Sequence, residues 1–129
     1  MEAAGPGTPL SDRNRDDAAG RLWLALPLAA RRHWLISHVY AVLGDGRNAL
    51  QWAQTCATLT DEHAGETRDF DVAYAQEALA RAHAATGHPD EARRHHGLAR
   101  TLGDQIADAE DRKIFDADFG AGPWFGVVG

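Results

Sequence analysis

The first half of the chain shows two stretches in which apolar residues recur at helical spacing. Apolar positions three and four apart in residues 28–43 predict an amphipathic helix. The segment Gly44-Asp45-Gly46 is expected to end it, since glycine accepts a left-handed backbone. A second helix is expected over residues 47–60. The predicted core positions of the two helices are Ile36, Val39, Tyr40 and Leu43, then Ala49, Leu50, Ala53, Cys56 and Leu59.

The same pattern returns after a polar linker of residues 61–69. A helix over residues 70–86 is predicted, and Gly87 is expected to end it. Pro89 then opens a helix that runs to about residue 103, because proline suits the first turn. The residues predicted to be buried on the helix of residues 70–86 are Leu79, Ala82 and His83.

Both ends of the chain differ from these two helix pairs. Residues 1–12 predict a mobile arm, and residues 13–24 predict a short helix. Asp108 is expected to cap a last helix over residues 109–119. We therefore expect one all-α domain over residues 13–129, with helical hairpins at about 28–60 and 70–103 and capping helices at both ends.

Composition and charge narrow the function classes. A net charge of −6 argues against nucleic acid as the partner, because that partner needs a clustered basic surface. The sequence contains no run of about twenty apolar residues, so no membrane span is expected. Cys56 is the only cysteine, which excludes an internal disulfide. We expect a cytoplasmic protein.

The two hairpins align with each other when the sequence is shifted by 43 residues. Gly44 then falls on Gly87, and the remaining aligned pairs are Ile36 with Leu79, Ala49 with Ala92, Cys56 with Ala99 and Leu59 with Leu102. Small residues in this register let two helices approach closely. The pattern resembles a tetratricopeptide repeat. Residues 69–82 also look like those of uncharacterised small actinobacterial proteins of this type.

The resemblance leaves open how the repeats are covered. Two repeats are fewer than the roughly three that such folds usually need for stability. The terminal helices and the Trp124-Phe125 segment are one candidate cover, and a second copy of the chain, which would make a homodimer, is the other.

The resemblance also implies a binding face on the first helix of each hairpin, opposite the predicted core stripe. The side chains expected in this concave groove are Arg31, Trp34, His38, Tyr74, Glu77 and Arg81. Aromatic rings offer flat apolar contact, and arginine binds carboxylates through paired hydrogen bonds. The first functional hypothesis is therefore an interaction module that binds a peptide or a small anionic ligand.

Two alternatives remain open. One is a small biosynthetic or modifying enzyme in which His38 and Glu77 form an acid–base pair beside Tyr74, in the groove or at a dimer interface. The other is a purely structural role, in which Trp124-Phe125 or the N-terminal helix fills the groove.

No metal ion or other cofactor is predicted. His95 and His96 are adjacent on one helix and point about 100° apart, so they do not share one ion. His83 is expected to be a core histidine, and Cys56 an inert thiol in a slot for a small residue.

Overall fold

The computed structural model describes residues 28–128, and all regular structure in that range is helical. A helical segment covers residues 28–42, and four further helices follow it: α2 (Gly46–Glu62), α3 (Asp69–Thr86), α4 (Pro89–Asp104) and α5 (Ala109–Gly120). None of the described helices is long and apolar enough to cross a membrane. The predicted arm of residues 1–12 and helix of residues 13–24 lie outside the described residues.

The helix ends follow the local sequence signals. Asp45 caps α2 by accepting a hydrogen bond from the Asn48 amide, and Asp108 caps α5 by accepting one from the Asp111 amide. Gly87 ends α3 with a φ of +84°, a conformation that favours glycine. Pro89 lies in the first turn of α4. The predicted helix positions are confirmed to within two residues.

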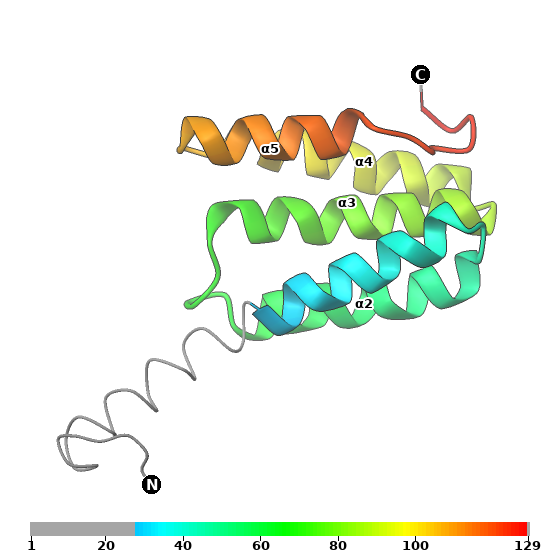
Figure 1. Ribbon diagram of the computed structural model, residues 1–129, viewed down its shortest axis with the longest axis horizontal. Coiled ribbons are helices and arrows are strands. Elements are labelled where there is room, and N and C mark those ends of the chain that lie inside the picture. The colour runs from blue at the N-terminus through cyan, green and yellow to red at the C-terminus, as the bar shows by residue number, and fades with distance from the viewer. Residues whose placement is uncertain (1–27, 129) are drawn as a thin grey trace, which may run out of the picture.

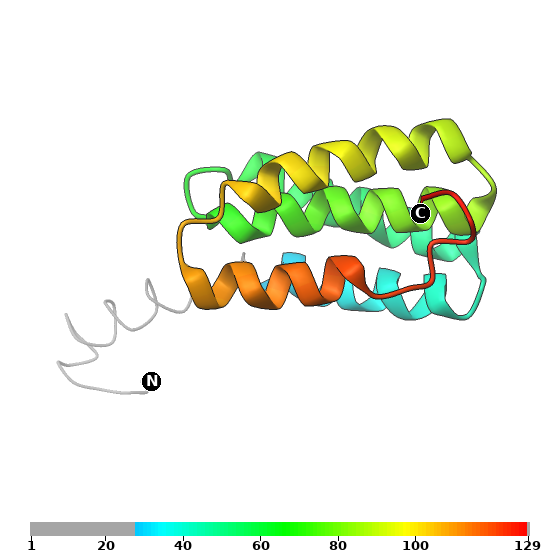
Figure 2. The same cartoon turned by 90° about the horizontal axis from the view of Figure 1, so that it is seen from above.

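Helix α3 lies at the centre of the fold. Figure 1 shows it between α4 on one side and α2 with the segment 28–42 on the other, and Figure 2 shows α5 running alongside. Ten of its eighteen residues are buried, which is more than in α2, α4 or α5. Neighbouring helices therefore enclose Glu77 and Arg81 of α3 fully and Tyr74 in part.

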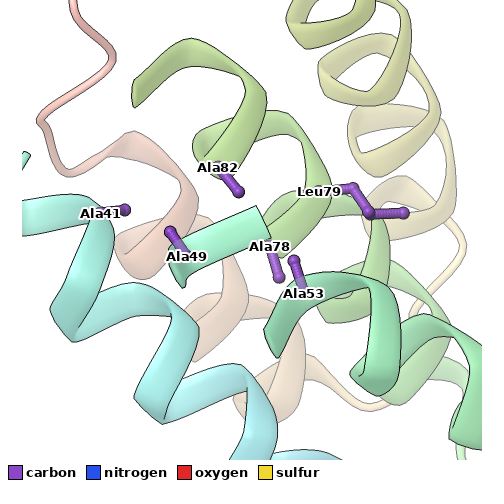
Figure 3. Packing of buried hydrophobic residues seen from close by; sticks show 6 residues of the cluster. All are labelled: Ala41, Ala49, Ala53, Ala78, Leu79 and Ala82. Carbon is purple, nitrogen blue, oxygen red and sulfur yellow. The ribbon is translucent and has the colours of Figure 1, made fainter. Parts of the chain in front are cut away.

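Small side chains form the core between the segment 28–42, α2 and α3. Ala41, Ala49, Ala53 and Ala82 are fully buried, and Figure 3 shows these methyl groups meeting between the helices. A Cβ atom added at Gly46 would lie 2.6 Å from backbone atoms of Ala85 and Thr86. The helix backbones approach closely because the side chains between them, from glycine and alanine, are small.

The predicted core stripe of the first helix is wrong at two of its four positions, since Ile36 and Tyr40 are half-buried but Val39 and Leu43 are exposed. Val39 is 50 % exposed and Leu43 is 73 % exposed, whereas Ala30, Ser37 and Ala41 are buried. The segment turns its small residues toward α2 and α3, because an alanine-rich interface has no room for a row of large side chains. It therefore presents an exposed apolar stripe, which consists of Leu28, Leu35, Val39 and Val42.

Candidate functional site

The six side chains predicted to share a face do lie together. Arg31, Trp34 and His38 extend from the segment 28–42, and Tyr74, Glu77 and Arg81 extend from α3. The indole Nε1 of Trp34 donates a hydrogen bond of 2.5 Å to Glu77 Oε1. The Trp34 ring also meets the Tyr74 ring edge-on at 5.0 Å and stacks on the His38 ring at 5.3 Å.

Glu77 and Arg81 form an ion pair inside the protein. Their side chains are 0 % and 1 % exposed, and Arg81 Nη2 lies 2.6 Å from Glu77 Oε2. The Arg81 Nε–H donates a second bond of 2.8 Å to the same oxygen. Because both Glu77 oxygens accept hydrogen bonds from Trp34 and Arg81, this carboxylate is already satisfied.

The C-terminal segment closes this end of the predicted groove. The remaining N–H groups of Arg81 donate to the backbone carbonyls of Asp118, Ala121 and Pro123 at 2.9–3.1 Å. The Trp124 ring covers the guanidinium at 4.1 Å. Arg81 therefore holds the chain after α5 against this end of the groove. The hypothesis of a purely structural role expected the Trp124-Phe125 segment at this position.

His38 does not pair with Glu77. Its Nδ1 is buried and has no hydrogen-bond partner among the described residues. Burial and the nearby Arg81 lower the pKa of His38, against the opposing effect of Glu77 and Asp118. Burial and a 2.5 Å hydrogen bond to Asp118 raise the pKa of the Tyr74 hydroxyl, so Tyr74 is a neutral donor.

A pocket of about 250 Å³ remains on the other side of Trp34. Its accessible lining is almost entirely apolar. Leu35 lines it and is 53 % exposed, so the pocket reaches the surface beside the exposed apolar stripe. The residues that line it are Ala30, Arg31, Trp34, Leu35, Cys56, Thr60, Phe70, Asp71, Tyr74 and Asp118.

An ion pair lies at the pocket. The Arg31 Nε and Nη2 groups donate to the two Asp71 carboxylate oxygens at 3.1 and 3.3 Å. The guanidinium also lies over the Phe70 ring, 4.8 Å from its centre. Asp71 in turn accepts from the Arg68 amide at the start of α3, so Arg31 is tied to a fixed point of the neighbouring helix.

Cys56 is buried in the lining of this pocket as a protonated thiol. Burial raises its pKa to about 12, and its Sγ donates to the Ala30 carbonyl oxygen at 3.2 Å. This environment fits the inert core thiol that was predicted.

The sequence reasoning missed part of the site. Leu35, Phe70 and Asp71 line the pocket but were absent from the predicted set. A signal did exist for Asp71, which precedes Tyr74 by three residues and so shares its helix face.

The candidate site therefore has a filled end at Arg81 and a hollow end at Trp34. No protein-family model matches the chain, and comparisons with curated proteins and with solved structures found no match either.

Proposed function

We propose that this protein is a small, tetratricopeptide-like interaction module that binds one large apolar side chain of a peptide partner in the Trp34 pocket. The pocket is the observation that carries the proposal, since it is the apolar hollow of the predicted groove that the C-terminal segment leaves free. Single buried anchors of this kind supply much of the affinity of peptide-binding surfaces.

The size of the pocket favours a side chain over a whole small molecule. Sites for drug-sized ligands usually measure roughly 300–1,000 Å³. At about 250 Å³, this pocket suits a leucine or an aromatic ring that projects from a longer chain. Rings from Trp34, Phe70 and Tyr74 surround such an anchor with flat apolar surface.

The exposed apolar stripe supports a peptide that continues past its anchor. Leu35 belongs both to the pocket lining and to this stripe. The stripe residues are spaced seven, four and three apart, so they form one face of the helical segment 28–42. An amphipathic partner helix laid along this face would bury the stripe together with the pocket.

The charges around the pocket favour a neutral or basic partner. Arg31 is already bound to Asp71, and Arg81 is bound to Glu77, so each guanidinium is engaged by a carboxylate of this chain. Asp118 adds a further acidic group to the lining. This arrangement supports the peptide half of the sequence hypothesis and gives no support to a small anionic ligand.

The hydrogen bonds give the enzymatic alternative no support. Glu77 accepts from Trp34 and Arg81, and no hydrogen bond links it to His38 among the described side chains. A purely structural role remains the competing proposal, because the chain itself fills the Arg81 end.

A peptide-display selection against the full chain tests the proposal. We expect selected peptides to share one leucine, phenylalanine or tryptophan. Leu35→Arg should weaken their binding at least tenfold, because it places a charge at the mouth of the pocket. Leu98→Arg is the matched control, since Leu98 is 42 % exposed on α4, which contributes no residue to the pocket or the stripe. Equal binding by both variants, or selection without a shared anchor, would leave the structural role as the better account.

A further inference from the structure

A group of metal-ligating side chains surrounds the turn between α3 and α4, away from the pocket. His83 lies in the last turn of α3, and His88 is the N-cap residue of α4. Glu91 and His95 follow on α4, four residues apart, so they share one helix face. The left-handed Gly87 makes the turn tight enough to bring His83 against that face.

We propose that His83, Glu91 and His95 bind a divalent zinc ion. One ligand atom from each residue can be chosen so that all three lie within 4.8 Å of one another. Zinc bonds of about 2.0–2.1 Å in a tetrahedral site place two ligand atoms roughly 3.4 Å apart. Side-chain rotations must close this difference and must also turn one imidazole ring, because the lone pairs of two stacked rings lie in separate parallel planes. The His83 and His95 rings are stacked, with an angle of 3° between their planes.

The tautomer of His95 already suits a metal ligand. Its Nδ1 lies 2.7 Å from the Gln76 side-chain oxygen, which accepts hydrogen bonds and does not donate them. Nδ1 therefore carries the proton, and Nε2 keeps its lone pair. Metal-binding histidines commonly donate their second N–H to a neighbouring oxygen in this way.

A cationic group already bridges two of the proposed ligands. The Arg94 Nη2 lies 3.0 Å from Glu91 Oε2 and 3.2 Å from His95 Nε2. The carboxylate oxygen and the imidazole lone pair thus face the same positive group. Arg94 is 58 % exposed, so its guanidinium can move into solvent when an ion takes its place.

His88 lies beside the proposed ligands and is not one of them. Its Nδ1 shares a hydrogen bond of 3.1 Å with the Nδ1 of His83, so one of these two nitrogens carries the proton. Imidazole and carboxylate ligands suit zinc, whereas calcium and magnesium prefer sites built from oxygen alone. The described residues thus offer two imidazoles and one carboxylate, and a water molecule would complete a four-coordinate ion.

Titration of the full chain with Zn²⁺, followed by calorimetry, tests the site. We expect one equivalent to bind with micromolar or tighter affinity, and Co²⁺ in its place to give the strong visible absorption of four-coordinate cobalt. His95→Gln should weaken binding at least 100-fold, while His63→Gln, a half-exposed histidine outside the group, should leave it unchanged. If His95→Gln does not fold, Glu91→Gln makes the same comparison at an exposed position.

Arg94 provides a test that a merely structural cluster does not pass. Arg94→Gln removes the competing cation, so it should tighten zinc binding several-fold. Arg93→Gln is the control, because Arg93 is equally exposed and pairs with Asp90 outside the group. The absence of stoichiometric binding, equal losses in His95→Gln and His63→Gln, or equal behaviour of Arg94→Gln and Arg93→Gln would each overturn the proposal.

Discussion

All three guanidinium nitrogens of Arg81 on α3 donate hydrogen bonds inside the protein, and Glu77, one helical turn away, is the acidic partner. The pair connects three parts of the chain. Glu77 accepts from Trp34 of the first helical segment, and Arg81 donates to carbonyls at the end of α5 and beyond it. Two residues predicted to bind an external ligand thus bind groups of the protein itself: Glu77 binds Trp34 and Arg81, and Arg81 also binds the C-terminal segment.

Removing Arg81 alone should strongly destabilise the fold. Arg81→Met leaves Glu77 buried without its counter-ion, and breaking such a pair costs about 3–5 kcal/mol. Arg93→Met breaks an exposed pair with Asp90, which should cost less than about 1 kcal/mol. Urea unfolding of both variants measures the difference. Similar losses in the two variants would mean that the Arg81 pair is not enclosed.

The ring of Trp124 should contribute more to stability than its neighbour Phe125. Trp124 covers Arg81, contacts His96 and Phe119, and donates from Nε1 to the Phe119 carbonyl oxygen. Trp124→Ala should therefore lower the free energy of unfolding by roughly 2–3 kcal/mol. Phe125 is 45 % exposed, and Phe125→Ala should change it by less than about 0.5 kcal/mol. Thermal and urea unfolding give both values, and a smaller loss for Trp124→Ala than for Phe125→Ala would contradict the packing.

Two glycine substitutions should have opposite effects. Gly46→Ala places a methyl group 2.6 Å from the backbone of α3, and such overpacking costs about 1–3 kcal/mol. Gly97→Ala meets open space in the middle of α4, where replacing glycine gains about 0.4–1 kcal/mol. The midpoints of denaturant unfolding report both changes. A stable Gly46→Ala variant would show that α2 and α3 lie further apart than described.

The positions of the helices were readable from the sequence. Glycine at 44 and 87, proline at 89 and aspartate at 108 act through local backbone and capping geometry, which needs no knowledge of the neighbours. The orientation of the first helix was not readable in this way. Large apolar residues such as Val39 and Leu43 suggest a core, but here the core is built from alanine.

The sequence predicted which residues lie together in the candidate site, but it did not predict how deeply they are buried. The predicted binding face included both Trp34 and Glu77, and these two side chains do meet. Burial of Glu77 and Arg81 depends on where the segment after α5 folds back, which no local pattern encodes. The proposed zinc ligands were missed because His83 and His95 belong to different helices.

Acid should weaken the fold through His38. Burial and Arg81 lower the pKa of His38 below its usual value of about 6.5, although Glu77 and Asp118 oppose the shift. The unfolded chain then binds more protons than the folded one, so stability present above about pH 6.5 falls as the pH decreases toward the folded pKa. Urea unfolding at pH 7.5 and 5.5 should show a larger acid loss in the wild type than in His38→Leu. The His63→Gln variant should keep the wild-type loss; an unchanged loss in His38→Leu would contradict this role.

The division of the predicted face into a hollow end and a filled end can be measured in one NMR titration. The probe is N-acetyl-phenylalanine amide, which carries one aromatic anchor and no charge. The account predicts that the indole N–H signal of Trp34 shifts as the anchor enters the pocket, and that the Trp124 signal over Arg81 stays in place. A shift of the Trp124 signal with Trp34 unmoved would show that the Arg81 end is the open one, and would contradict the account.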